Sequence, residues 1–450
     1  MDGGGSPLWH DHPWRELLTN EVHARPSAAL RAPLRASHLA FLTGETAADS
    51  DRAHLAALCR RVGAPPPSPG ENHHDVDGGT FRLRWERHTE FSTYTVFRAG
   101  GFADPFAEPA VAALPRDWWQ AIGGERLVAV HVAVEPATAP RRDPAGLLAV
   151  FGSDNYVGSE MSGGAATAWT DFRIHGDGFG RILIRDSGLA EREAGRLVQR
   201  LLEIETYRMM ALLALPVARE VWPQLSGIDA RLAAITARLA ALQEDGAEGE
   251  RGLLAELTGL AALNERIANE TNYRFGASRA YHALVGRRTE ELRERRIEGL
   301  QTIAEFMERR LAPAMRTCDS VGVRLEALSQ RVTRASNLLR TRVDIALEEQ
   351  NRDLLRSMDR RARLQMRLQE AVESVGAVAI CYYLLGLVAY ALKGAKAAGL
   401  HLDAELAVGA AVPMVALLVW GGMHRIRSVV TRAAGQGRTG QAGAGSGAYH

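Results

Sequence analysis

The sequence predicts an α+β protein with a small N-terminal α/β domain, a long helical or coiled-coil stalk and a C-terminal hairpin of two transmembrane helices. Strand-like alternation is confined to the chain before Ser187, helical spacing continues from Leu189, and two uncharged runs lie near the C-terminus. The predicted parts are a flexible tail (1–8), the α/β domain (9–187), a helical region (188–322), a stalk helix (323–373), two membrane spans (374–392 and 406–423) and a disordered tail (435–450).

Residue patterns in the N-terminal domain predict one helix among several strands. Apolar residues on one face of Ala48–Val62 predict the helix, and the proline-rich segment Gly63–His74 predicts a loop. Alternating or continuous apolar segments predict strands at 36–44, within 81–98, at 127–134 and at 147–151. Thr170–Ile184 predicts a hairpin, because Gly and Asp in the turn His175–Gly178 supply the positive φ angles that such turns need.

The chain from Leu189 onward has helical spacing. Glu191–Pro216 contains an apolar stretch of about ten residues, which is too short to cross a bilayer, so we expect a helix packed on the α/β domain. Two amphipathic helices are predicted at 228–242 and 253–272, and helix is expected to continue after Tyr273 to about Cys318.

The stalk helix carries a seam of side chains at three- and four-residue spacing. The seam begins at Leu325, Leu328, Val332, Ala335 and Leu339, and after a local slip it continues through Val343, Leu347, Asn351, Leu354 and Met358. This spacing is typical of coiled coils, in which a polar residue such as Asn351 sets the register at a cost in stability. A long helix with this seam must pack on the preceding helices, on copies of itself, or both, so a homo-oligomer is expected.

Two uncharged runs, Ser374–Leu392 and Leu406–Met423, are each about long enough to span a bilayer as a helix. Charged flanks disfavour the alternative of a buried soluble hairpin. The sequence predicts helix contacts through Tyr382, Tyr383 and Pro413. Arginines before the first run and after the second predict that both termini are cytoplasmic. The expected location is the bacterial inner membrane, with the lipid bilayer as a partner.

Composition excludes some classes of function. The net charge of +1 does not favour nucleic-acid binding. The three cysteines, Cys59, Cys318 and Cys381, are too widely spaced for a zinc motif or a disulfide framework. The glycines form no phosphate-binding Walker pattern, and the sequence leaves the identity of any cofactor unknown.

The candidate functional residues of the domain are Glu86, His88 and Glu90. If they alternate along a strand they share one face, where they would make an acid/base or ligand-binding cluster, including a metal site. A polar, solvent-facing strand explains the same pattern. Loop histidines and acids at 10, 12, 73–75 and 77 match no metal-binding template, and His23 is expected to be a structural histidine.

Several segments resemble the bacterial membrane-anchored family known as domain of unknown function 3422. They are EVHARP (21–26), ERHTEFSTYT (86–95), TDFRIHGDGFGR (170–181), EIETYRMMALLALPVARE (203–220), RRLAPAMRTC (309–318) and LLRTRVDIALEEQNRDLLRSMDRRARLQ (338–365). The resemblance covers nearly the whole chain. It implies a two-span C-terminal anchor and brings no known activity.

Three functions remain open from the sequence. The leading hypothesis is a membrane-anchored cytoplasmic scaffold or sensor. The alternative is an oligomeric divalent cation channel of the CorA type, which the plan of stalk and two spans resembles. Such channels carry Gly-Met-Asn after the first span, and here the corresponding residues, Tyr390–Gly394, lack it. The third is an enzyme that uses Glu86, His88 and Glu90.

Overall fold

The computed structural model describes residues 10–16, 18–19, 27–241, 247–397 and 404–439 of the chain. The EVHARP segment with His23 and the predicted tail over 1–8 lie outside the described residues. The chain divides into two compact units, Met1–Leu339 and Arg340–His450.

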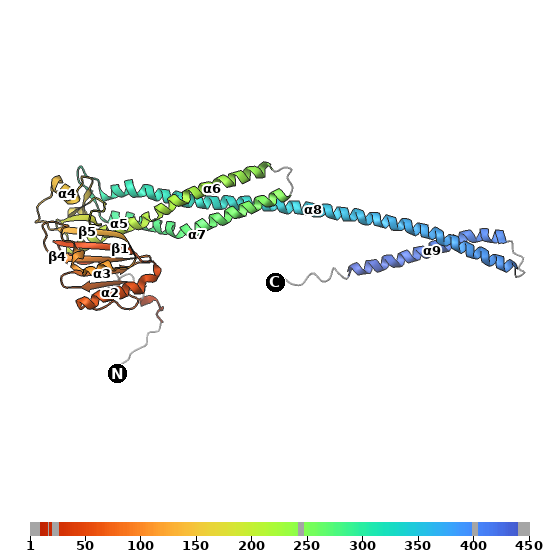
Figure 1. Cartoon of the computed structure of the whole chain (residues 1–450), viewed down its shortest axis with the longest axis horizontal. Coiled ribbons are helices and arrows are strands. Elements are labelled where there is room, and N and C mark those ends of the chain that lie inside the picture. The colour runs from red at the N-terminus through yellow and green to blue at the C-terminus, as the bar shows by residue number, and fades with distance from the viewer. Residues whose placement is uncertain (1–9, 17, 20–26, 242–246, 398–403, 440–450) are drawn as a thin grey trace, which may run out of the picture. The chain divides into compact units, whose positions relative to one another are not determined.

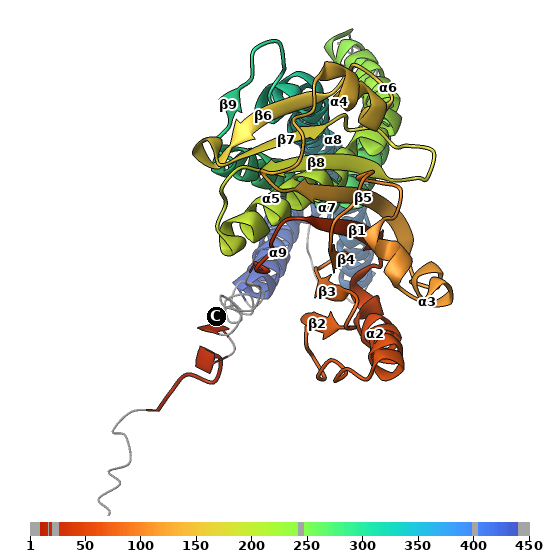
Figure 2. The same ribbon diagram turned by 90° about the vertical axis from the view of Figure 1, so that its left-hand side faces the viewer.

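The first unit is built on one mixed sheet with the strand order β2-β3-β4-β1-β5-β8-β7-β6-β9 among the described residues (Figure 2). Neighbouring strands are antiparallel except β5 and β8, which pair in parallel with Val130 opposite Gly180. The strands are β1 (Leu34–Leu42), β2 (His73–Asp77), β3 (Arg82–Arg87), β4 (Phe91–Ala99), β5 (Glu125–Glu135), β6 (Val157–Met161), β7 (Ala166–Thr170), β8 (Gly180–Asp186) and β9 (Arg295–Arg296).

Helices cover both faces of this sheet (Figures 1 and 2). One face packs on α5 (Glu191–Leu212), and the opposite face packs on α2 (Ala48–Val62), α3 (Arg116–Gln120) and α4 (Pro144–Phe151). Because side chains alternate along a strand, each strand contributes to a hydrophobic core on both faces of the sheet. Phe91 and Phe97 of β4 face α5, whereas Tyr94 and Val96 face α2. The first face is named the α5 face below, and the second the α2 face.

A glycine lets α5 approach the chain just before β1. A Cβ atom built on Gly195 would lie 1.6 Å from the carbonyl oxygen of Ala28, so no larger residue fits without moving the backbone. At its start, α5 carries Glu191 and Glu193 in the first turn, where the helix dipole favours acidic side chains. The buried helix that the sequence predicted at 191–216 is therefore confirmed as α5 and the start of α6.

Three further helices complete the first unit: α6 (Ala214–Ala241), α7 (Ala247–Glu291) and α8 (Ile303–Ala397), of which the part up to Leu339 belongs here. Their apolar faces continue the core of the α5 face. Asp229 of α6 accepts hydrogen bonds from Arg324 of α8 at 2.9 and 3.2 Å. The two amphipathic helices predicted from the sequence are thus parts of α6 and α7.

Predictions of secondary structure were wrong in three places. His73–Asp77, which was expected to lie in a loop, is strand β2 and pairs with β3. Leu147–Phe151 is the end of helix α4, because Asp143 caps its first turn by accepting a hydrogen bond from the Gly146 amide at 2.7 Å and Pro144 follows the cap. The helix expected to run unbroken to Cys318 stops at Glu291, and β9 lies in the gap. Glu294 then accepts hydrogen bonds from the amides of Ile303 and Ala304, both at 2.9 Å, and so starts α8.

The predicted hairpin at Thr170–Ile184 is present in longer form. Thr170 pairs with Ile182, which makes β7 and β8 neighbours, but a loop over 171–179 joins them. The predicted turn lies inside that loop, where the Gly178 amide donates to the His175 carbonyl oxygen at 2.9 Å and Gly178 has φ +82°.

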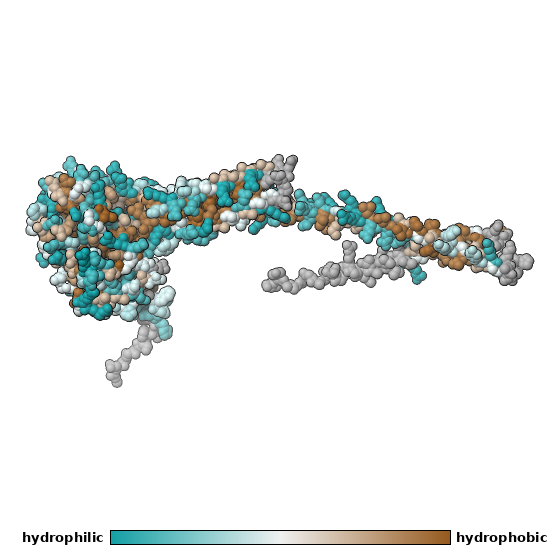
Figure 3. Space-filling model, in the orientation of Figure 1, coloured by the Kyte–Doolittle hydropathy of each residue, from teal (hydrophilic) through white to brown (hydrophobic). Residues whose placement is uncertain are grey.

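The second unit contains the rest of α8 and α9 (Ala404–Thr439). Its helices carry many exposed apolar side chains, shown in brown in Figure 3. Helix α9 continues to Thr439, so residues 435–439 of the predicted disordered tail are helical.

Candidate functional site

A pocket lies between the α5 face of the sheet and α5 itself. Its cavity volume is about 50 Å³, which is room for a few water molecules or a small ligand, since one water needs about 10–15 Å³. The polar residues that line it come from β1, β3, β4, α5 and the β3–β4 turn: His38, Arg84, Glu86, His88, Thr93, Thr95, Gln199, Glu203, Thr206 and Tyr207. It is named the α5 pocket below.

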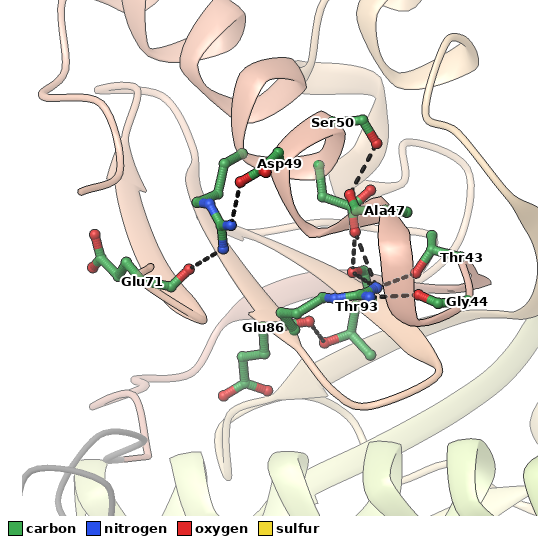
Figure 4. A network of polar contacts seen from close by, with 12 residues as sticks. Thr43, Gly44, Ala47, Asp49, Ser50, Glu71, Glu86 and Thr93 are labelled. Carbon is green, nitrogen blue, oxygen red and sulfur yellow. Dashed lines mark hydrogen bonds and ion pairs between the residues drawn. The ribbon is translucent and has the colours of Figure 1, made fainter. Parts of the chain in front are cut away.

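Two of the three predicted site residues line this pocket. Glu86 lies on β3, and Figure 4 shows its carboxyl group pointing away from Thr43 and Gly44 on the other face. His88 lies in the β3–β4 turn, because β3 ends at Arg87, and its ring stacks on Phe91 at a centroid distance of 4.2 Å. The prediction of one strand carrying all three residues was therefore wrong, although Glu86 and His88 do meet at one pocket.

Glu90 does not line the α5 pocket. It is buried and ion-paired with Arg274 of α7. Burial, with the nearby charge of Glu90, raises the pKa of Tyr281 on the same helix. Glu90 thus connects the β3–β4 turn to α7. A sequence pattern could not reveal this contact, because its partner is 184 positions away.

His38 is a pocket residue that sequence reasoning missed. Its Nε2 lies 3.0 Å from the Thr206 hydroxyl, which itself donates to the Leu202 carbonyl oxygen at 2.9 Å. Nε2 therefore donates, and Nδ1 accepts from the Thr95 hydroxyl at 2.8 Å. Burial lowers the pKa of His38 to about 4, so the ring is neutral at pH 7. The available signal was a histidine inside an otherwise buried strand.

Ion pairs balance the charges at the rim of the pocket. Arg84 donates two hydrogen bonds to Asp75 of β2, both at 2.9 Å. Burial opposes ionisation of Asp75, but the hydrogen bonds and charge of Arg84 outweigh it and lower the pKa. On the opposite side, Glu203 of α5 pairs with Arg288 of α7. The pocket walls are therefore polar and held in place.

A separate polar network lies on the α2 face, and Figure 4 shows the part of it around Thr43 and Gly44. Arg87 and Asp51 are buried there at 3.3 Å, and the Ser92 hydroxyl donates to Asp51 at 2.5 Å. Arg87 also donates to Thr43 at the end of β1. These contacts join α2 to β3, to β4 and to the end of β1, and none of these residues lines the α5 pocket.

Three side chains on the α2 face have the order of a catalytic triad. The Ser37 hydroxyl lies 2.9 Å from Nδ1 of His131, and Nε2 of His131 lies 3.9 Å from Asp177. Ser37 is fully buried and accepts a hydrogen bond from the Val111 amide at 3.0 Å. Because a substrate cannot reach its hydroxyl, this arrangement is structural: it anchors the loop that carries Asp177.

Metal binding was one chemistry considered for the predicted residues. Over the described ranges, no three or more His, Cys, Asp or Glu side chains are grouped so as to hold a metal ion. His74 instead makes a hydrogen bond to the Pro65 carbonyl oxygen at 3.0 Å.

The residues predicted to lie in the membrane, and the stalk from Arg340 onward, belong to the second unit. Two helices, α8 and α9, each contain a window long and apolar enough to cross a membrane, which is weak evidence by itself. Tyr382 and Tyr383 are 76% and 72% exposed, and Pro413 lies within α9. The seam residues Leu354 and Met358 are 61% and 59% exposed, and Asn351 is exposed too.

The fold and pocket define a class of protein: an α+β sheet domain with a small polar pocket, followed by long helices that include two apolar segments. The chain belongs to the family described as Protein of unknown function (DUF3422), which matches residues 10–430 and so agrees with the resemblance seen in the sequence. No curated protein and no solved structure matches the chain.

Proposed function

We propose that the chain is a membrane-anchored cytoplasmic sensor or scaffold that works as an oligomer. One observation carries the proposal: the apolar windows of α8 and α9 are 0% and 6% buried. Apolar helix surface of this length is unfavourable in water, and a bilayer would cover it. The large sheet domain then remains on the aqueous side.

The arginines support a cytoplasmic sheet domain. Arg356, Arg360, Arg361, Arg363 and Arg367 precede the first apolar run, and Arg425 follows the second. Positive charge is retained on the cytoplasmic side of short spans. The proposed topology has both termini inside and the short link between α8 and α9 outside, in a bacterial inner membrane.

The α5 pocket supports a sensing role. It brings acidic, basic, imidazole and hydroxyl groups around a small space on a rigid sheet, which is the arrangement that orients a small polar ligand. Its buried histidine, His38, has both ring nitrogens engaged by the Thr95 and Thr206 hydroxyls, and Thr206 donates in turn to the Leu202 carbonyl oxygen, so the imidazole serves to join β1 to β4 and α5. Ligand recognition is therefore favoured over catalysis.

Reporter fusions test the anchor. Fusions after Arg432 should report a cytoplasmic location, and fusions at Ala398 an external one. The full chain in membrane fractions should resist extraction by carbonate and dissolve in detergent. Extraction by carbonate, or the reverse pattern of reporters, would contradict the proposal.

Cross-linking tests the oligomer. Single cysteines at Leu354 and Met358, in a chain whose Cys59, Cys318 and Cys381 are replaced by serine, should form disulfide-linked dimers in membranes. A cysteine at Asp353, adjacent but off the seam, is the matched control and should cross-link less. Equal cross-linking at all three positions, or none, would argue against a specific seam.

The alternative, a divalent cation channel, predicts flux. The full chain in liposomes is tested for uptake of Mg²⁺ and Co²⁺ with an internal fluorescent indicator. We expect no flux above that of empty liposomes, because neither apolar run contains an Asp, Glu, Lys or Arg and the Gly-Met-Asn motif is absent. Flux that saturates with cation concentration would favour the channel over the sensor.

A further inference from the structure

A second pocket lies at the start of β5, on the side of the sheet that α5 covers. None of the predicted site residues Glu86, His88 and Glu90 lines it. Its cavity volume is about 240 Å³, and its walls come from β5, the loop over 171–179, the first residue of β8 and the C-terminal half of α5. The lining residues that carry the argument are Arg126, Leu127, Phe172, Arg173, Arg208 and Met209. It is named the arginine pocket below.

The pocket has an excess of positive charge. Arg208 is neutralised by Glu205, which accepts hydrogen bonds from its Nε at 3.0 Å and from its Nη2 at 2.6 Å. Arg126 lies 5.7 Å over the Phe179 ring, and Arg173 donates to the Ser153 hydroxyl at 3.4 Å. Across the described parts of the chain, neither Arg126 nor Arg173 makes an ion pair. Two guanidinium charges are thus available to a ligand.

The loop that carries Arg173 is held in one shape. Asp171 accepts a hydrogen bond from the Arg173 amide at 3.2 Å and lies 3.0 Å from His175. Asp177 accepts from the Phe179 amide at 3.0 Å, and the Phe179 ring stacks on His131 at a centroid distance of 3.9 Å. A loop whose backbone is held in place before binding loses less conformational entropy when a ligand binds.

One wall of the pocket is apolar. Leu127, Val128 and Met209 line it, and so does Phe172, whose ring centroid lies 4.4 Å from that of Phe306 on α8 and 5.1 Å from the Arg208 guanidinium carbon. Ile174, the residue after Arg173, also lines the pocket and is 79% exposed. An anion with no apolar part would leave this wall in contact with water.

We propose that the arginine pocket binds a phosphate group attached to an apolar moiety. Guanidinium groups bind phosphate through paired hydrogen bonds, and two unpaired arginines match the two negative charges of a phosphate monoester. The apolar moiety lies against Leu127, Phe172 and Met209. Such a ligand comes either from a soluble phosphate ester or from the headgroup of a phospholipid. The site is distinct from the α5 pocket and does not depend on the membrane topology proposed above.

Calorimetric titration of the full chain in a neutral detergent tests the proposal. The probes are phenyl phosphate, a soluble ester, and dihexanoyl phosphatidic acid, a phospholipid with chains short enough to stay monomeric. At least one should bind, and the tighter of the two identifies the source. Inorganic phosphate should bind more weakly than the tighter of the two. If it binds equally well, the apolar part of the proposal is wrong.

Substitutions locate the binding. Arg126→Gln and Arg173→Gln should each weaken binding about tenfold or more, because each removes a charged hydrogen-bond donor, and the double variant should not bind. Arg238→Gln on α6, an exposed arginine outside the pocket, is the control and should bind like the wild type. Thermal unfolding of each variant confirms that it folds. Binding by neither probe, or equal binding by all variants, would overturn the proposal.

Discussion

The two faces of the sheet bury polar groups in different ways. On the α2 face, Arg87 and Ser92 are both bonded to Asp51. On the α5 face, polar side chains surround the α5 pocket. Glu86 and Arg87 are neighbours in sequence but belong to opposite faces. The difference teaches that a buried charge does not mark a site by itself: on the α2 face the paired charges join elements, whereas on the α5 face the polar groups border a cavity.

The largest effect is expected from a substitution that breaks the polar network on the α2 face. Asp51→Ala leaves Arg87 buried without its carboxylate and should lower the free energy of unfolding by about 3–5 kcal/mol. Chemical denaturation of the full chain in detergent, followed by tryptophan fluorescence, measures it, because Trp85 and Trp118 lie in the core on this face. Asp49→Ala, whose carboxylate pairs with Arg52 at the surface, is the control and should change stability by less than about 1 kcal/mol. Equal losses would contradict the comparison.

The next effect is a dependence on pH that both faces share. Each face buries one histidine, His38 or His131, and burial lowers the pKa of each to about 4. The unfolded chain, with a histidine pKa of about 6.5, takes up these protons first, so stability is full above pH 6.5 and falls as pH drops toward 4, by about 3 kcal/mol for each histidine.

Replacing one histidine separates the two faces. His38→Gln should halve the histidine part of this slope between pH 6.5 and 5, and denaturation at several pH values measures it. His131→Gln is the matched variant on the α2 face. A slope that His38→Gln leaves unchanged would show that His38 is not held neutral in the α5 pocket.

A smaller effect tests the close approach of α5. Gly195→Ala pushes a methyl group against the Ala28 carbonyl oxygen and should cost about 1–3 kcal/mol. Gly259→Ala in α7 has nothing within 4 Å of the new methyl group and should stabilise the chain by about 0.5–1 kcal/mol, because alanine favours helix. Thermal unfolding compares the two. A stable Gly195→Ala variant would mean that α5 can move away from the sheet.

The smallest expected effect concerns the pocket itself. His88→Gln removes the ring that stacks on Phe91 in a turn that is partly exposed, so it should change stability by about 0.5 kcal/mol or less. If the α5 pocket serves the function, the variant should still fail to complement a deletion of the wild-type gene. Normal melting together with normal complementation would remove His88 from the site.

Much of the fold could be predicted because local patterns agree with the structure. Ala48–Val62 was predicted to the residue, since its apolar spacing and the following Gly63 both indicate a helix and its end. The prediction of a strand at Leu147–Phe151 was wrong because a short apolar run does not distinguish a strand from a helix. The signal for the start of a helix lay in Asp143 and Pro144 before the run. Strands β6 and β7 were not predicted, because small residues such as Gly158, which lies against Trp169, hide their alternation.

The candidate site was harder to predict because its residues come together only through the fold. Glu86 and His88 were found by their spacing, but Thr206 and Glu203 reach the α5 pocket from a helix more than a hundred positions away. Glu90 shares their spacing and yet pairs with Arg274. Spacing along a strand indicates on which face of the sheet a side chain lies. It does not indicate which residues of a packed helix that side chain contacts.

The short strand β9 has a consequence for how the chain is made. Ser159 on β6 donates a hydrogen bond to Glu294, 135 positions later, and Arg295–Arg296 then pair with β6 at the edge of the sheet. During synthesis that edge stays open until the ribosome has completed α5, α6 and α7, and an unpaired edge invites wrong pairing with other chains. We therefore expect nascent chains released before Arg296 to aggregate, and contacts of such long sequence separation to make the completed sheet slow to fold.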